Sequence, residues 1–125
     1  MPFLLKTEPG KYSFDDLERD GETTWDGISN NTALLNLRSM KPGEKLVIYH
    51  SNVGKAVVGT AKVVSVDATD PKDPKVRIKP VKRLKKEKTL DDMRQTPVFK
   101  DSLLFRQFRL SVVPLTDAQY DWLTL

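Results

Sequence analysis

The sequence contains no cysteine and only one histidine. Disulfides and thiolate metal sites are therefore excluded, and a metal centre would have to be built almost wholly from carboxylates, so we expect no metal and no other cofactor. No apolar run approaches the length of a membrane span, and residues 1–6 lead into a strand pattern rather than a leader peptide. The sequence predicts a single domain over residues 1–125, monomeric and cytoplasmic, without membrane association.

The motifs of common enzyme classes are missing as well. There is no Gly-x-Ser-x-Gly elbow, no glycine-rich phosphate loop and no paired metal-ligand motif. His50 and Ser51 are adjacent in the chain, and no second base is evident that could complete a hydrolytic triad. We therefore assign no catalytic residue and do not expect an enzyme.

Positive charge is concentrated in one segment. The net charge is +4, but residues 72–88 contain nine Lys or Arg against two acidic residues, so the rest of the chain is slightly acidic. Such a cluster is typical of surfaces that neutralise phosphates, and Lys82, Arg83, Lys85 and Lys86 are the predicted phosphate ligands. The alternative, given equal weight from charge alone, is a solvated sheet edge whose lysines prevent aggregation.

The apolar pattern predicts a mixture of strands and short helices. Strands are expected at 3–6, 45–50, 56–66, 75–79 and 108–113, with a bend at Gly59. Helices are expected from Ser13 to about Gly21, over 28–40, and from the capping residues Thr89 and Thr116. Strands outnumber the helical crossovers of a parallel sheet. The predicted fold class is therefore α+β: a small curved or closed, mostly antiparallel β-barrel whose openings are capped by helices.

Two polar islands predict a pocket for a planar heterocycle. Trp25 lies in an expected loop before a helix, and Tyr49 to Asn52 follow an apolar strand. Aromatic rings supply a stacking surface, and the short polar groups can form hydrogen bonds. Strand alternation places Tyr49 and Ser51 on one face and His50 on the other, so all three converge only if the strand ends or bulges at His50.

Short motifs in a fixed order resemble the EVE domain family. They are Lys6-Thr-Glu-Pro, Tyr12-Ser13 with Asp16-Leu17, Trp25-Asp-Gly-Ile-x-Asn30, Leu37-Arg38-x-Met40-x-x-Gly43, Tyr49-His-Ser-Asn52, Val58-Gly59 and Arg109-Leu-Ser-Val-x-Pro114. The resemblance covers almost the whole chain. It implies a PUA-like β-barrel related to YTH and ASCH domains, and it implies a module that binds nucleic acid through a modified base, either modified cytosine in DNA or a modified RNA base.

The resemblance also nominates the residues of the pocket. They are Lys6, Trp25, Gly27, Asn30, Tyr49, His50, Ser51, Asn52, Leu110 and Ser111. Ser29 joins them for a different reason, because it opens the helix after Trp25, where free backbone N–H groups can donate to a ligand. We expect Trp25 and Tyr49 to enclose the base while the hydroxyl and amide groups recognise its edge. Two alternatives remain open: a small-molecule or nucleotide sensor, or an enzyme, that uses the same pocket; and a partner-binding domain whose interface is the basic segment.

Two arginines of the family pattern are absent. Ser29 and Leu34 stand where the pattern has arginine. Neither residue can replace the bidentate phosphate contact of a guanidinium. Either the phosphates are held elsewhere, for example by residues 72–88, or binding is weaker than is usual for the family.

Overall fold

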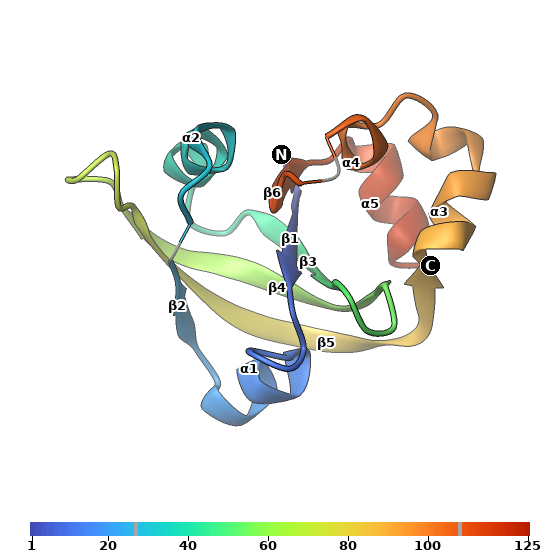
Figure 1. Cartoon of the computed structure of the whole chain (residues 1–125). Coiled ribbons are helices and arrows are strands. Elements are labelled where there is room, and N and C mark those ends of the chain that lie inside the picture. Colours follow the sequence, from blue (N-terminus) through green and yellow to red (C-terminus); the bar gives the residue numbers. More distant parts are fainter. Residues whose placement is uncertain (27, 108) are drawn as a thin grey trace.

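One curled, six-stranded sheet forms the frame of the molecule. The computed structural model describes residues 1–26, 28–107 and 109–125. The strands are β1 (Phe3–Thr7), β2 (Thr23–Trp25), β3 (Lys45–His50), β4 (Ala56–Asp67), β5 (Lys75–Thr89) and β6 (Val112–Pro114), in the spatial order β2-β5-β4-β3-β1-β6. Within these ranges only β1 and β3 pair in parallel. Among the described residues β2 and β6 are the two edges, so the sheet is a half-barrel (Figure 1).

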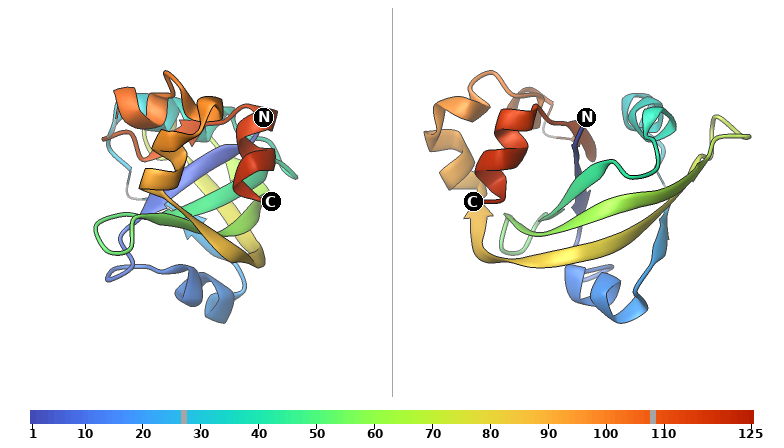
Figure 2. Two further views of the ribbon diagram at one scale, coloured as in Figure 1. Left: turned by 90° about the vertical axis from the view of Figure 1, so that its right-hand side faces the viewer. Right: turned by 180° about the vertical axis from the view of Figure 1, so that it is seen from behind.

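Short helices cover the ends and one side of this half-barrel. They are α1 (Phe14–Asp20), α2 (Asn31–Ser39), α3 (Leu90–Gln95), α4 (Leu103–Arg106) and α5 (Asp117–Leu123), with a 3₁₀ turn at Pro97–Phe99. The helices α3, α4 and α5 gather near the end of β5, while α1 lies across the β4–β5 ribbon from the other helices (Figures 1 and 2). The predicted α+β class, with a curved and mostly antiparallel sheet capped by helices, is confirmed.

Side-chain caps explain where the helices begin. The side chains of Ser13, Thr89 and Thr116 each accept a hydrogen bond from the third helical N–H. In return, the side-chain oxygen of the third helical residue accepts one from the backbone N–H of the capping residue. These reciprocal capping boxes satisfy donors that a helix start leaves unpaired. Asn30 caps α2 in the same position but without the return bond. The sequence predicted the starts at Ser13, Thr89 and Thr116, whereas α2 begins three residues later than expected, at Asn31.

Phe14 is the centre of the contact between α1 and the sheet. Its side chain is fully buried, and its ring lies directly over the backbone of Gly59. The β4–β5 register shifts between Val57 and Gly59, which confirms the predicted bend. A glycine stands at this bend because a Cβ atom would overlap the ring of Phe14.

Three expectations about the strands were wrong. β5 continues ten residues beyond the predicted end, because Pro80 lies at a register irregularity opposite Ala61 where its missing N–H is tolerated. β6 starts only at Val112, because the N–H of Leu110 bonds to the carbonyl of Gln107 in a turn. Trp25 ends strand β2, paired with Val76, rather than lying in a loop.

Candidate nucleic-acid interface

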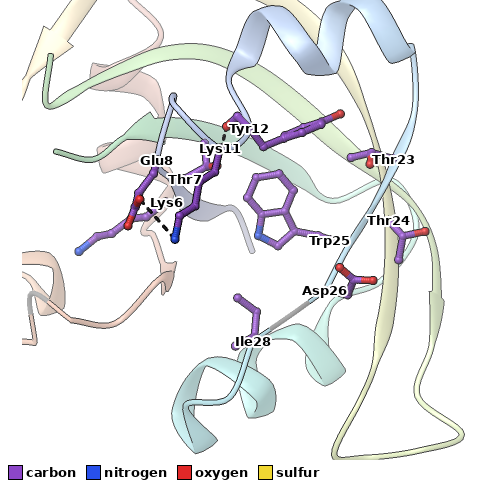
Figure 3. A pocket seen from close by; sticks show the side chains of 10 residues that line it. All are labelled: Lys6, Thr7, Glu8, Lys11, Tyr12, Thr23, Thr24, Trp25, Asp26 and Ile28. Carbon is purple, nitrogen blue, oxygen red and sulfur yellow. Dashed lines mark hydrogen bonds and ion pairs between the residues drawn. The ribbon is translucent and has the colours of Figure 1, made fainter. Parts of the chain in front are cut away.

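A pocket of about 480 Å³ opens beside Trp25 between β1, β2 and the start of α2. We call it the Trp25 pocket (Figure 3). Its lining combines one indole, one phenol, three threonines, an isoleucine and four charged side chains: Lys6, Thr7, Glu8, Lys11, Tyr12, Thr23, Thr24, Trp25, Asp26 and Ile28. A concave surface of this mixed character suits a ligand that is planar, partly apolar and bordered by hydrogen-bonding groups.

Trp25 is held in place from two sides. Its ring is only 8% exposed, so most of it belongs to the core and part of it faces the pocket. The ring of Tyr12 meets it edge to face, with 6.2 Å between the ring centroids and an angle of 78°. The hydroxyl of Tyr12 donates to Asp20 Oδ2 at 2.9 Å. The indole therefore needs little reordering when a ligand arrives, which reduces the entropic cost of binding.

Charges of both signs border the Trp25 pocket. Lys11 pairs with Glu8 at 3.6 Å, and the carboxylate of Asp26 lies 3.9 Å from the ammonium of Lys75. Burial lowers the pKa of Lys6 below its ordinary value. With two lysines and two carboxylates in its lining, the pocket carries no strong excess of either charge, which suits an uncharged ligand better than an isolated phosphate.

A second pocket of about 470 Å³ lies beside Tyr49. We call it the Tyr49 pocket. The residues of its lining come from β1, β3, the β3–β4 loop, α3 and α4: Lys6, Tyr49, Ser51, Asn52, Lys55, Leu90, Arg94, Leu104 and Phe105. Lys6 lines both pockets, and its ammonium lies 5.9 Å from the centroid of the Tyr49 ring.

The predicted sandwich of Trp25 and Tyr49 around one ligand was wrong. The two rings line different pockets, and Tyr12 rather than Tyr49 packs against the indole. The reason lies in the sheet: Tyr49 is paired with Lys6 in the β1–β3 ladder, whereas Trp25 sits at the far edge strand β2. Ser51 and Asn52 accompany Tyr49 in the second pocket, as strand alternation predicted for Ser51.

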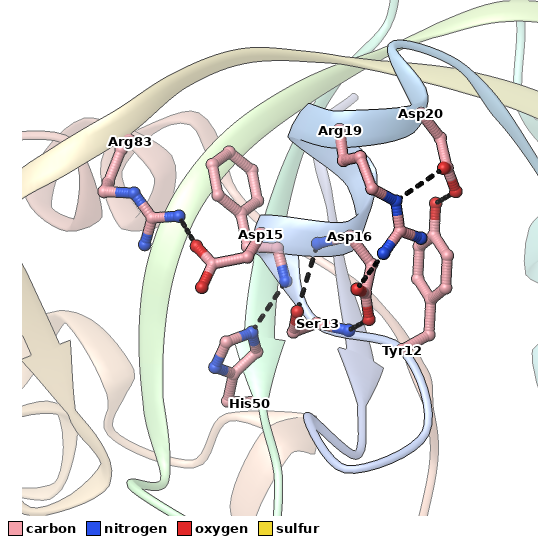
Figure 4. Close-up of polar contacts among 9 residues, drawn as sticks. Tyr12, Ser13, Asp15, Asp16, Arg19, Asp20, His50 and Arg83 are labelled. Atoms are coloured by element: carbon pink, nitrogen blue, oxygen red, sulfur yellow. Dashed lines mark hydrogen bonds and ion pairs between the residues drawn. The ribbon is translucent and has the colours of Figure 1, made fainter.

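His50 lies on the other face of β3, against α1 (Figure 4). Its Nε2 accepts a hydrogen bond from the backbone N–H of Phe14 at 3.0 Å. The ring must be neutral to accept this bond, because both nitrogens of a protonated histidine are donors. Although the β3–β4 register does shift between Ile48 and Tyr49, His50 lines neither pocket. The histidine therefore anchors α1 to the sheet.

This anchor predicts a loss of stability in weak acid. Burial lowers the pKa of His50 below its ordinary value near 6.5, and the nearby Arg83 acts in the same direction, while Glu87 and Asp15 oppose them. The contribution of neutral His50 to the stability of the fold is complete above pH 6.5, the pKa of histidine in the unfolded chain. This contribution is lost as the pH falls through the lower pKa of His50 in the folded state. We expect the melting temperature to drop between pH 7.5 and pH 5.5.

His50→Gln is the matched control for this titration. A glutamine oxygen can accept from Phe14 but does not titrate, and the chain has no other histidine. Asp16, Asp20, Asp67 and Asp92 have lowered pKa values and lose their protons well below this range. Thermal melts should show a smaller pH dependence for the variant. A wild-type melting temperature that is unchanged at pH 5.5 would contradict the role of His50.

The remaining predicted pocket residues lie outside both linings. Ser29 and Asn30 are exposed, and the Asn30 side chain is used to cap α2 through the N–H of Ala33 at 3.0 Å. Leu110 is buried, and Ser111 contributes its carbonyl to the N–H of Lys6 at 2.9 Å. Gly27 falls outside the described residues.

The basic segment is divided between exposed and internally paired side chains. Lys82, Lys85 and Lys86 are exposed on β5. The guanidinium of Arg83 instead bonds to Asp15 and Glu18 of α1 and lies over the ring of Phe14. Arg83, one of the four predicted phosphate ligands, is thus already paired with carboxylates of the chain itself.

Of the ten residues that line the Trp25 pocket, only Lys6 and Trp25 were nominated from the sequence. Tyr12, Thr23 and Thr24 were not nominated, and neither were Glu8 and Lys11. Signals for some of them existed, since Glu8 and Tyr12 stand within two of the family motifs, and the two threonines before Trp25 are β-branched residues typical of a strand. Nothing in the sequence alone indicated that β2 would pair with β5 and carry Trp25 to the sheet edge.

The EVE domain family model matches residues 2–124. The chain belongs to the EVE domain family. Thymocyte nuclear protein 1 of Rattus norvegicus is 28% identical over 97% of this chain and 71% of its own length, and that of Danio rerio is 31% identical over 96% and 69%. The resemblance inferred from the ordered motifs is thereby confirmed.

Solved structures of the same fold come from bacteria and from humans. A protein of Agrobacterium tumefaciens superposes with a TM-score of 0.92 at 32% identity, over 98% of this chain and 90% of that one. The human THYN1 protein, in a complex with DNA containing 5-methylcytosine, superposes with a TM-score of 0.86 at 28% identity, over 97% and 94%. An ASCH protein of Zymomonas mobilis shares the fold alone, with a TM-score of 0.59 at 9% identity.

Neither a metal site nor a membrane helix is found in the described ranges. No group of three or more His, Cys, Asp or Glu side chains there could hold a metal ion. No helix in the same ranges is long and apolar enough to cross a bilayer.

Proposed function

We propose that this EVE domain binds DNA carrying a modified cytosine, such as 5-methylcytosine, and accommodates the modified base in the Trp25 pocket. The observation that carries the proposal is the human THYN1 complex with DNA containing 5-methylcytosine, a relative that superposes over 97% of this chain. In this chain the same fold forms the Trp25 pocket and a second pocket that shares Lys6 with it and contains two further cations, Lys55 and Arg94.

The chemistry of the Trp25 pocket supports a methylated cytosine as the ligand. The indole of Trp25 offers a surface for stacking, and Ile28 adds an apolar contact for a methyl group. Carboxylates accept hydrogen bonds from the N4 amino group of cytosine, and the pocket contains two of them, Glu8 and Asp26. A threonine hydroxyl such as that of Thr24 can donate to the carbonyl oxygen O2 or to the ring nitrogen N3 of cytosine.

A base inside the pocket must have left the duplex stack. Flipping costs a few kcal/mol, and the cost is smaller in single-stranded or mismatched DNA. The pocket lies at the side of the half-barrel and does not accept a whole duplex in a volume of about 480 Å³. Binding through an extruded or unpaired base is therefore part of the proposal.

The proposal describes a binding module rather than an enzyme. The one histidine, which would be the natural general base, is turned away from both pockets and bonded to the backbone of Phe14. Among the residues that line the Trp25 pocket there is no histidine and no cysteine, the side chains that most often serve as general base and nucleophile.

The test compares two DNA strands that differ only in a single methyl group. Fluorescence anisotropy at one fixed salt concentration measures the affinity of the protein for a strand with one 5-methylcytosine and for the same strand with cytosine. We expect tighter binding to the methylated strand, and weaker binding of methylated duplex than of methylated single strand. Equal affinities for the methylated and unmethylated strands would contradict the proposal, and the same pair in RNA shows whether the sugar matters.

A further inference from the structure

The two neighbouring pockets differ in electrostatic character. The Trp25 pocket has two lysines and two carboxylates in its lining, whereas the charged side chains of the Tyr49 pocket are all cations: Lys6, Lys55 and Arg94. A phosphodiester next to a flipped base has to be placed close to that base. The pocket that shares Lys6 with the Trp25 pocket is therefore well placed to receive it.

We infer that the Tyr49 pocket is the phosphate-binding site of this domain and holds the phosphodiester beside the modified nucleotide, with Lys55 and Arg94 as its principal cations. This inference rests on the proposed function. It moves the main phosphate contact away from the basic strand β5 and onto the β3–β4 loop and α3.

Two cations of the Tyr49 pocket, Lys55 and Arg94, have no acid paired with them in the part of the chain that the structure describes. The guanidinium of Arg94 lies 5.6 Å from the centroid of the Phe105 ring. On β5, by contrast, Arg77 pairs with Glu22 and Arg83 pairs with Asp15 and Glu18. A phosphate at the Tyr49 pocket would gain cations without breaking existing ion pairs.

Neutral donors accompany these cations. The side chains of Ser51 and Asn52 line the pocket, and in the part of the chain that the structure describes neither side chain forms a hydrogen bond. Hydroxyl and amide donors commonly contact phosphate oxygens beside Arg and Lys. Leu90, Leu104 and Phe105 form the apolar part of the lining, against which a deoxyribose ring can pack.

The backbone holds the two cations in a defined arrangement. Lys55 has a φ of 38°, in the left-handed region that residues with a side chain seldom adopt. The carbonyl of Lys55 accepts a hydrogen bond from the N–H of Leu90 at 2.9 Å, which ties the β3–β4 loop to the first residue of α3. Because Arg94 lies one turn further along α3, this bond places both cations on one wall. Strained residues that the surrounding structure holds in place are concentrated at binding sites.

Two charge-matched double variants test the assignment. Lys55→Gln with Arg94→Gln removes two cations from the Tyr49 pocket, and Lys82→Gln with Lys85→Gln removes two exposed cations from β5. Each lowers the net charge equally, and thermal melts establish that both variants are folded. Anisotropy titrations over a range of salt concentrations use the methylated and unmethylated strands described above.

We expect the Tyr49-pocket variant to bind both strands about tenfold more weakly at low salt. The slope of log affinity against log salt should become shallower by about 0.7, because each neutralised phosphate of a single strand contributes about 0.7 and the pocket holds one phosphodiester. The ratio between methylated and unmethylated affinities should not change, since phosphate contacts do not read the base. The β5 variant should retain the wild-type slope.

The other possible results refute the phosphate site, the base recognition, or both. A wild-type slope in the Tyr49-pocket variant, or equal losses in both variants, refutes the phosphate site even when the methyl preference is intact. A changed slope without any methyl preference in the wild type refutes the proposed base recognition but retains the phosphate site. Absence of binding to either strand refutes both.

Discussion

Replacing Trp25 by leucine should abolish most of the preference for the methylated strand. Stacking of one base on an aromatic ring contributes about 1–3 kcal/mol, so the affinity for the 5-methylcytosine strand should fall about tenfold or more. The affinity for the unmodified strand should fall by a smaller factor, because cytosine occupies the pocket less than 5-methylcytosine does. Leucine preserves an apolar side chain where the indole packs into the core, so the effect on binding can be separated from unfolding by a thermal melt.

Trp122→Leu is the matched control for this substitution. Trp122 lies on α5, where its ring packs against Phe99, and it lines neither the Trp25 pocket nor the Tyr49 pocket. The control should reduce stability without altering the ratio of the two affinities. A Trp25→Leu protein that is folded and keeps the wild-type ratio would show that the indole does not contact the base.

Gly59→Ala should be the most damaging small substitution in the sheet. The new methyl group would overlap the ring of Phe14, which is fully buried and cannot turn aside. Overpacking of this kind costs about 3 kcal/mol in the free energy of unfolding, at the upper end of the usual range. Chemical denaturation monitored by fluorescence measures the loss as a lower midpoint.

Two further variants test whether the loss comes from this contact. Gly10→Ala introduces the same methyl group where no atom lies within 4 Å, so its effect should stay close to zero. In a Phe14→Leu background, where the ring is gone, Gly59→Ala should cost about 1 kcal/mol or less if the two residues are coupled. Equal costs of Gly59→Ala with and without the ring would assign the effect to the strand backbone instead.

Local signals in the sequence were enough for most of the fold. The capping residues Ser13, Thr89 and Thr116 predicted three helix starts because their side chains satisfy backbone donors next to them in the chain. The bend at Gly59 was predicted for a similar local reason, since a glycine inside a strand pattern marks a close approach or a bulge. The full length of β5 was not predictable, because the proline within it is tolerated only through its register with β4.

The candidate site was predicted less completely because pockets depend on pairing between distant segments. Lys6, Trp25, Tyr49, Ser51 and Asn52 do line pockets, but the sequence could not show that they form two pockets rather than one. The division follows from the sheet order, which separates β2 from β3 by two strands. His50, which the family motifs also nominated, lies outside both pockets and holds α1 against the sheet instead.

The two positions at which the family pattern has arginine, Ser29 and Leu34, lie away from both pockets. Leu34 is 7% exposed and belongs to the buried face of α2, while Ser29 is exposed outside both pockets. Neither position contributes a cation to the described interface. We infer that Lys55 of the β3–β4 loop and Arg94 of α3 provide the phosphate contact instead. Both residues lie outside the basic segment 72–88.

The fluorescence of Trp25 reports directly on whether a modified base lies against its indole ring. Trp122→Phe leaves Trp25 as the only indole in the chain. Saturating this protein with the 5-methylcytosine strand, with occupancy followed independently by anisotropy, should quench and shift the emission of Trp25, and the cytosine strand should do so only at higher concentration. Emission that stays constant while the methylated strand saturates the protein would contradict the account.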